Sequence, residues 1–326
     1  MTTRPRAATR AQSDRGREYG VMITSTDIER LALLARWYCL TPAQLAHAEM
    51  PITDWHPDYR PDGHPSDDYT RRLVGIKARL AKLARIIEHA PAHVGPLARS
   101  VLVDPALAKQ PTTRYETAWH ATRYGATAAG VPWEIRPTIS PHNAAHAILA
   151  ADIGLQLEAT GVRVLSEREI VTGLDRHGDQ ITAPLTSSHT SPGGRVTDKR
   201  PDLAVLYADN TGCIAIEIER QTSRSIRLYI DKITAYIANP HIHAIWYLCA
   251  SDTTARRVSA AAIEVLGEHS TYPLRIRTVT AYRDHHEIPN LLDETGPGRY
   301  GTPIANPLRS DLEATLTEPT SRGTHR

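Results

Sequence analysis

The sequence predicts an α/β protein (α+β overall) in which a helix-turn-helix domain precedes a sandwich of mixed β-sheet and flanking helices. Two observations carry this prediction. Between residues 26 and 87, a helix, a short helix and a long basic helix follow one another, which is the order of a helix-turn-helix. Between residues 144 and 279, the pattern runs helix, three strands, helix, strand, helix and strand.

The composition is that of an ordinary globular protein. The chain has 326 residues, of which 41% are hydrophobic and 23% charged, and this length suits two domains with tails. No apolar run approaches about 18 residues, so we expect no transmembrane helix and no membrane partner. The three cysteines are isolated from one another and the N-terminus lacks the apolar core of a signal peptide, which together predict a cytoplasmic location.

The small net charge of +2 is unevenly distributed along the chain. Residues 1–100 hold 15 basic and 11 acidic residues, whereas the remainder is slightly acidic. A basic front and an acidic rear are typical of a DNA-docking domain followed by a metal-binding one. Residues 1–22 are rich in Arg and Thr and poor in apolar residues, so we expect them to form a flexible basic arm.

Two short helices are expected at the start of the first domain. Thr26 and Glu29 have the spacing of a capping box, which would begin the first helix there. Thr41 as N-cap and Pro42 at the first helical position would begin the second helix, which ends near Ala48.

A long third helix is expected from Asp68 or Thr70 to about Ile87. Its apolar residues recur at helical spacing, and basic side chains lie off that stripe. As the recognition helix of a helix-turn-helix, it would contact DNA through phosphates; the alternative is an ordinary solvated face. The candidate DNA-binding residues are Arg71, Arg72, Lys77, Arg79, Lys82 and Arg85.

Three strand-like segments and a short helix complete the first domain. The segments at residues 86–87, 101–103 and 115–120 would supply the wing strands, and residues 122–129 would close the domain. We therefore predict a winged-helix domain over residues 23–130 and a proline-containing linker over residues 131–141.

The second domain is expected over residues 142–284, followed by a disordered tail at residues 285–326, which are rich in Pro, Thr and Gly. Residues 175–199 are polar and should form a loop or an irregular hairpin. The expected helices are 144–160, a segment carrying Lys232, and 253–269; the expected strands are 162–165, 203–207, 213–218, 243–250 and 274–279.

Carboxylates flank two neighbouring strands of this domain. Asp202 precedes one apolar run, and a turn sequence, Asp-Asn-Thr-Gly, connects it to a second run that ends in Glu217 and Glu219. Side chains alternate along a strand, so both glutamates share one face. Crowded carboxylates favour a hard cation, and Mg²⁺ or Mn²⁺ would suit Asp202 and Glu217. The alternative is a sheet edge whose glutamates face water.

An amphipathic helix follows these strands at once. Lys232 flanks its apolar stripe and lies four residues before Tyr236. A lysine there could stabilise the charge that develops on a scissile phosphate. Equally, it could extend along the helix surface toward water.

The pattern Pro-Asp, hairpin, E-x-E, then a helix with K-x-x-x-Y resembles the PD-(D/E)xK nuclease superfamily, with an acid in place of the usual E-x-K lysine. More narrowly, the chain resembles the actinobacterial replication-relaxation family over roughly residues 25–280. That resemblance implies an N-terminal winged helix and a C-terminal restriction-endonuclease-like α/β domain. It also implies functional roles for His146 and Glu167 alongside Asp202, Glu217 and Glu219. Glu167 or, from the preceding helix, Glu158 would complete the metal site.

Two functions follow as expectations. In the first, the protein binds double-stranded plasmid DNA and nicks or cleaves it with Mg²⁺ or Mn²⁺, using Asp202, Glu217, Glu219, Lys232 and His146 as catalytic residues and Asp202, Glu217 and Glu167 as metal ligands. In the second, the nuclease-like domain serves only binding and assembly with replication or mobilisation proteins. The acid cluster favours the first, and the missing E-x-K lysine favours the second.

Overall fold

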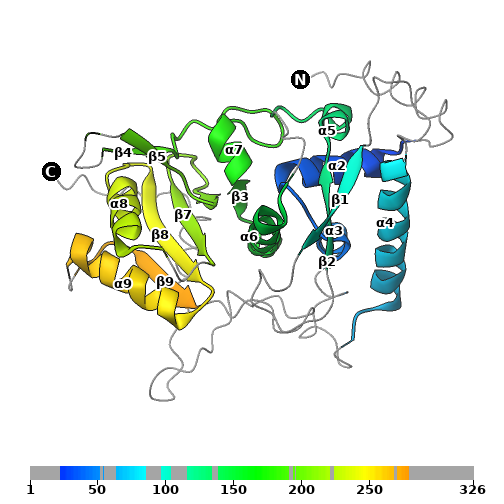
Figure 1. Ribbon diagram of the computed structural model, residues 1–326. Helices are drawn as coiled ribbons and strands as arrows, with labels where there is room; N and C mark the ends of the chain where they lie inside the picture. The colour runs from blue at the N-terminus through cyan, green and yellow to red at the C-terminus, as the bar shows by residue number, and fades with distance from the viewer. Residues whose placement is uncertain are drawn as a thin grey trace. The chain divides into compact units, whose positions relative to one another are not determined.

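The computed structural model describes residues 23–51, 54, 64–85, 97–103, 116–133, 139–190, 194, 196–220, 224–267 and 270–278 (Figure 1). The chain divides into two compact units, residues 1–151 with 176–178, and residues 152–175 with 179–326. The division falls inside helix α6 (Pro141–Ala159). The expected basic arm and C-terminal tail lie outside the described residues. Within the described residues, every helix is too short or too polar to cross a membrane.

Three helices open the first unit: α2 (Ser25–Arg36), α3 (Pro42–Glu49) and α4 (Asp67–Arg85). Helix α3 begins as predicted, with Thr41 accepting a bond from the Gln44 amide and Pro42 at the first helical position. The capping box of α2 was wrongly assigned to Thr26. It is formed by Thr24, whose extended backbone lets its hydroxyl accept from the Asp27 amide while the Asp27 carboxylate accepts from the Thr24 amide.

A two-stranded antiparallel sheet follows, made of β1 (Ala98–Val103) and β2 (Glu116–Ala121), and then the short helix α5 (Arg123–Ala129). Leu40, between α2 and α3, bonds through both backbone groups to Trp119 of β2, which ties the sheet to the helices. Helix α5 begins one residue after the expected start, because Thr122 is its N-cap and accepts a bond from the Gly125 amide. Gly125 lies so close to the chain that a Cβ there would be 2.0 Å from the Leu97 carbonyl oxygen.

The second unit is built on a five-stranded mixed sheet of order β3-β6-β7-β8-β9. Strands β3, β6 and β7 are successively antiparallel, and β7, β8 and β9 are parallel. The expected order of elements is confirmed. Their bounds are β3 (Arg163–Ser166), β6 (Leu203–Leu206), β7 (Cys213–Glu219), α8 (Ile226–Ile237), β8 (Ile242–Cys249), α9 (Asp252–Leu266) and β9 (Leu274–Thr278).

One helix of this unit was not predicted: residues 167–172, which follow β3, form the short helix α7 (Glu167–Thr172). The polar segment contains the hairpin β4 (Ser187–Thr190) and β5 (Val196–Lys199), one of the two forms expected for residues 175–199. The turn between β6 and β7 is as predicted, and Asn210 adopts the left-handed conformation there (φ 56°).

One face of the sheet packs against α8 and α9, which Figure 1 shows side by side. The core on this face joins Tyr229, Ile233 and Tyr236 of α8 and Val258 of α9 to buried residues of four strands. Because β8 and β9 follow the two helices, right-handed crossovers between parallel strands place both helices there.

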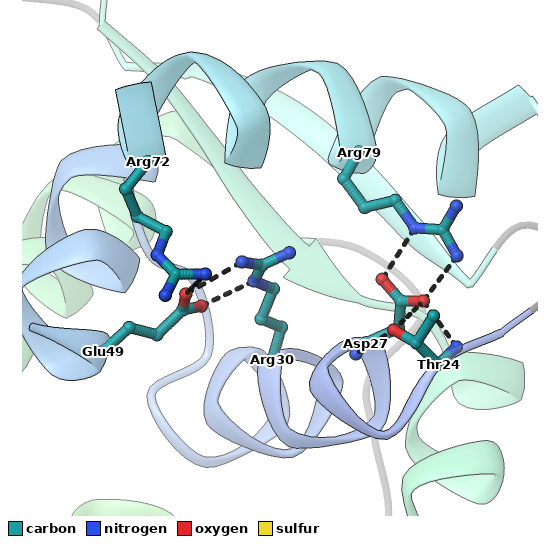
Figure 2. Close-up of polar contacts among 6 residues, drawn as sticks. All are labelled: Thr24, Asp27, Arg30, Glu49, Arg72 and Arg79. Carbon is teal, nitrogen blue, oxygen red and sulfur yellow. Dashed lines mark hydrogen bonds and ion pairs between the residues drawn. The ribbon is translucent and has the colours of Figure 1, made fainter. Parts of the chain in front are cut away.

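Ion pairs fix helix α4 against α2 and α3 (Figure 2). The Arg79 guanidinium donates to both oxygens of Asp27, a carboxylate that is only 1% exposed. One helical turn further along α2, Arg30 makes a two-pronged bond to Glu49 of α3 (2.5 and 2.8 Å), and Arg72 of α4 lies 3.7 Å from the same carboxylate. These contacts set how α4 lies across the other two helices.

Asp27→Asn should destabilise the protein by about 3 kcal/mol at pH 7, because it removes the buried charge that Arg79 binds. Chemical denaturation of the full chain measures this free energy. The matched control is Asp68→Asn at the exposed i,i+3 pair with Arg71, where both side chains are more than 70% exposed and we expect a change below about 0.5 kcal/mol.

The pH dependence of this pair has a definite sign. Burial alone would raise the pKa of Asp27, but its bonds with Arg79 and Thr24 lower it below the usual 3.8. The stabilisation is therefore complete above about pH 4 and lost as the pH falls through the lowered pKa. Equal acid sensitivity of wild type and Asp27→Asn would contradict this assignment.

Candidate active site

The strand register brings the predicted carboxylates to one row of the sheet. Leu203 pairs with Ile216 across the β6–β7 ladder, so the ladder continued by one residue places Asp202 opposite Glu217. Glu217 in turn pairs with Tyr247 of β8. Strand β7 is the middle strand of the sheet, and Glu217 and Glu219 are 3% and 4% exposed. The alternative of a solvated sheet edge is therefore wrong.

The backbone of β7 holds Asp202 in place. Its amide donates to the Ile216 carbonyl (3.1 Å), and its Oδ2 accepts from the Ile218 amide (2.8 Å). Asp202 thus extends the β6 ladder with its own side chain, which fixes the carboxylate beside Glu217. Its side chain remains half-buried, so this carboxylate lies at the open side of the cluster.

Helix α8 supplies two donors to the buried Glu217 carboxylate. The Lys232 ammonium bonds Oε2, and the Tyr236 hydroxyl bonds Oε1. Lys232 and Tyr236 are one helical turn apart, so both reach the same carboxylate from one face of α8. The lysine ammonium also lies over the Tyr236 ring, and its side chain is 19% exposed. Lys232 therefore reaches the acidic cluster and does not run along the helix surface.

The electrostatics follow from this burial. Burial raises the pKa of Glu217 to about 7; Lys232 opposes the rise and the Asp202 charge adds to it. Burial alone would lower the pKa of Lys232, but the charges of Glu217 and Asp202 outweigh burial and raise this pKa above its usual value. Lys232 therefore stays charged beside two acids, whose negative charges it balances in part.

Glu219 lies two residues after Glu217 on β7, and it has a different partner. Arg224, in the segment between β7 and α8, donates to its Oε2 at 3.0 Å. Glu219 pairs with Cys249 at the carboxyl end of β8. The two glutamates share a face, as predicted, but Glu217 is bound by α8 and Glu219 by the chain just before α8.

Two buried tyrosines around the cluster were missed by sequence reasoning. Tyr229 of α8 packs edge-on against Tyr247 of β8, with ring centroids 6.2 Å apart. Within the described part of the chain, neither hydroxyl has a hydrogen-bond partner. Burial, followed by the charges of Glu217 and Glu219, raises the pKa of Tyr247 well above its usual range. Strand alternation in residues 243–250 could have indicated Tyr247. The apolar stripe of the helix indicated that Tyr229 faces the core, but nothing local indicated its contact with Tyr247.

The other predicted acids lie apart from this pair of carboxylates in the chain. Glu167 lies just beyond the end of strand β3. It begins α7, directly after Ser166, whose partner Leu203 adjoins Asp202. Glu158 lies in the last turn of α6. Among the residues that the structure describes, no three His, Cys, Asp or Glu side chains are grouped as metal ligands.

His146 belongs to the first unit, whereas the carboxylates and Lys232 belong to the second. Its side chain is half-buried on α6. The backbone carbonyl groups two residues before it and two residues after it accept hydrogen bonds from side chains of the first unit. Cys39 Sγ lies 3.6 Å from the Ala144 oxygen, and Gln44 Nε2 donates to the Ile148 oxygen at 2.7 Å. These bonds fix the first part of α6 around His146, and its catalytic role stays a prediction.

The six predicted DNA-binding residues all lie on α4, but they differ in their surroundings. Arg72 and Arg79 face carboxylates of α3 and α2, as described above. Arg71 pairs with Asp68 at the exposed start of the helix. Lys77, Lys82 and Arg85 are exposed. The basic surface of α4 is thus carried mainly by these last three residues and Arg71.

Comparison with protein-family models, with curated proteins and with solved structures found no match to this chain.

Glu217→Gln should change how stability depends on pH. Because the pKa of Glu217 is raised in the folded state, its contribution is complete below about pH 4.5 and is lost as the pH rises through about 7. The unfolding free energy of the wild type should fall by at most about 3 kcal/mol across that pH range, and this fall should be absent from the variant. Urea denaturation in EDTA at several pH values measures it.

The control is Glu264→Gln, an exposed acid on α9 of the same unit, which should leave the wild-type slope unchanged. A Glu217→Gln protein that loses stability between pH 4.5 and 7 as steeply as wild type would show that Glu217 does not titrate in this way.

Proposed function

We propose that the second unit is a nuclease-like domain that hydrolyses phosphodiester bonds in DNA with the help of Mg²⁺ or Mn²⁺. The observation that carries this proposal is the meeting of Lys232 from α8 with Glu217 from β7, next to Asp202. Two carboxylates and a lysine are the elements of the PD-(D/E)xK motif. Here the lysine comes from the next helix, whereas the motif normally takes it from the strand two residues after the acid.

The donor set suits a magnesium ion bound together with substrate. Mg²⁺ is commonly held by one or two carboxylates, with waters and substrate phosphates completing its coordination. Asp202 and Glu217 supply two hard oxygen donors from adjacent strands, so a third protein ligand is not required. Such an ion would lower the pKa of a bound water and polarise the phosphate.

The residues of the chain would then have distinct tasks. Asp202, anchored by the Ile218 amide, presents a fixed carboxylate at the half-buried side of the cluster. Tyr236 holds Glu217 from inside the core. Lys232 is the partly exposed cation, and its ammonium would stabilise negative charge on the phosphate in the transition state.

We propose further that the first unit is a winged-helix domain that binds DNA. The order α2, α3, α4, β1, β2 is that of a helix-turn-helix with a wing. Lys77, Lys82 and Arg85 form the exposed basic side of α4 and would contact phosphates. Arg72 and Arg79 instead support the position of the helix. Plasmid DNA in replication or mobilisation is the proposed context.

A non-catalytic DNA-binding role is the second candidate, and one observation favours it. Glu219 replaces the motif lysine and is neutralised by Arg224, while both oxygens of Glu217 already have donors. An acid cluster satisfied in this way could persist as a structural element of a domain used for binding and assembly.

Asp202→Asn and Glu217→Gln should each abolish metal-dependent nicking of supercoiled plasmid, because each removes one of the two carboxylates proposed to bind the metal. Lys232→Met should slow nicking by about 100-fold or more. Gel assays with Mg²⁺, Mn²⁺ or EDTA measure this. Asp209→Asn, in the exposed β6–β7 turn, is the matched control and should retain wild-type activity. Intact DNA binding without nicking by wild type in either metal would favour the non-catalytic role.

Lys77→Ala combined with Lys82→Ala should weaken binding of double-stranded DNA at least about tenfold and lower the salt slope by about two, because two phosphate contacts are lost. Fluorescence anisotropy of the full-length protein over a salt series measures both. Arg123→Ala, an exposed basic residue on α5, controls for loss of a positive charge elsewhere in the same unit. Equal salt slopes in all three proteins would exclude α4 as the DNA contact.

A further inference from the structure

The carboxyl ends of β7 and β8 and the start of α8 meet beside Glu219. Glu219 and Cys249 are the last residues of two paired parallel strands, and each strand is followed by a helix that returns along the sheet. Ligands of open α/β sheets bind outside the carboxyl ends of such strands. A further binding site, in addition to the one at Glu217, is therefore expected at this end of the sheet.

The start of α8 is suited to an anion. Its N-cap, Ser225, makes no side-chain capping bond, and its first turn contains no acidic residue. Helix α9 differs, since Ser251 caps it and Asp252 occupies its first turn. The backbone amides and dipole at the start of α8 would favour a negatively charged group.

Two arginines lie at this end of α8. Arg224 directly precedes the helix and is 44% exposed, and one of its nitrogens bonds Glu219. Arg257, on the second turn of α9, donates to the Arg224 carbonyl at 3.4 Å, which ties its guanidinium to the same place. A guanidinium carries five N–H donors, so one such group can bind several acceptors at once.

A buried hydroxyl provides an independent sign of a ligand. Tyr229, in the first turn and a half of α8, is 2% exposed, and its hydroxyl has no hydrogen-bond partner within the described residues. Burying a hydroxyl without a partner is costly, so native proteins rarely leave one without an acceptor. Burial raises the pKa of this phenol; Glu219 adds to the rise, and Arg224 and Arg257 oppose it, so the phenol lies within electrostatic range of these three charges.

We propose that the Tyr229 hydroxyl, Arg224, Arg257 and the amino end of α8 form a subsite for a phosphate group of a nucleic-acid strand. The proposal rests on the proposed function, since it assigns the subsite to the strand that would be cleaved at Glu217. Residues two apart on a strand are about 7 Å apart, so this subsite, at Glu219, adjoins the cleavage site. It would bind a neighbouring phosphate of the same strand and fix which phosphodiester faces Lys232.

The chemistry favours a phosphate over a carboxylate ligand. The subsite joins donors from three directions: a hydroxyl from inside the core, guanidinium groups from the side and backbone amides from the helix. A tetrahedral phosphate presents oxygens in several directions, whereas a carboxylate presents two in one plane. Glu219 lies at the inner side of the subsite and holds Arg224 in place.

The test uses the full-length protein in EDTA and a 5′-phosphorylated thymidine dinucleotide as the probe, with binding measured by calorimetry. Arg257→Ala and Tyr229→Phe should each weaken binding about tenfold, because each removes one donor to the phosphate. Arg256→Ala, the exposed neighbour on the same helix, should bind like wild type. Arg224 is left unchanged, because its loss would also leave the buried Glu219 without this partner.

Thermal melts of each variant show whether it is folded, and Arg257→Lys provides a second, milder variant that should bind between wild type and Arg257→Ala. Binding of Arg257→Ala and Tyr229→Phe equal to that of Arg256→Ala would overturn the subsite. Inorganic phosphate binding as tightly as the dinucleotide would overturn its assignment to a nucleic-acid strand.

The binding test and the nicking assay can fail independently of each other. If binding of the dinucleotide requires Arg257 and Tyr229 but plasmid is never nicked, the phosphate subsite is supported and the proposed cleavage is wrong. If plasmid is nicked with dependence on Asp202 while these variants bind like the control, cleavage stands and the subsite is wrong.

Discussion

The second unit depends on one constraint: a carboxylate on the middle strand of its sheet must have a cation. Glu217 is 3% exposed, and an ionised carboxylate in such a place is costly without a charged partner. Helix α8 meets this need with Lys232 and adds the Tyr236 hydroxyl. Both donors require one face of α8 to lie over β7, so the position of the helix, the strand register and the charge balance are coupled.

The first unit solves a similar problem with arginine. Asp27 caps its own helix and, being almost fully buried, also takes the guanidinium of Arg79 from α4. Glu49 likewise binds Arg30 and lies near Arg72. Basic residues of α4 thus divide into those that hold the helix and those that face outward. The number of basic residues on a helix is therefore larger than the number available to bind nucleic acid, because some of them form ion pairs with buried acids of other helices.

Local patterns carried most of what could be predicted from the sequence. Alternation placed Glu217 and Glu219 on one face, and turn chemistry placed the hairpin, since both depend only on neighbouring residues. Contacts between residues that are far apart in the chain could not be predicted from these patterns. Whether Lys232 reaches Glu217 depends on how α8 packs, and the partner of Arg79 lies 52 residues away. The capping box was assigned to the wrong residues for the same reason, since Asp27 is held by its ion pair with Arg79 as well as by its bonds with Thr24.

The origin of the cation on a separate helix has a physical consequence for the proposed site. On a strand, an E-x-K lysine shares the carboxylate's own backbone, so the two cannot separate. Here the cation arrives from α8, fifteen residues on, and stays only while that helix is docked. The strand position two residues after Glu217 holds Glu219, which binds Arg224 at the amino end of α8. The positive charges near these two glutamates therefore lie at the start and on one face of a single helix and not on the strand. Docking of α8 on the sheet thereby assembles both the proposed cleavage site and the proposed phosphate subsite.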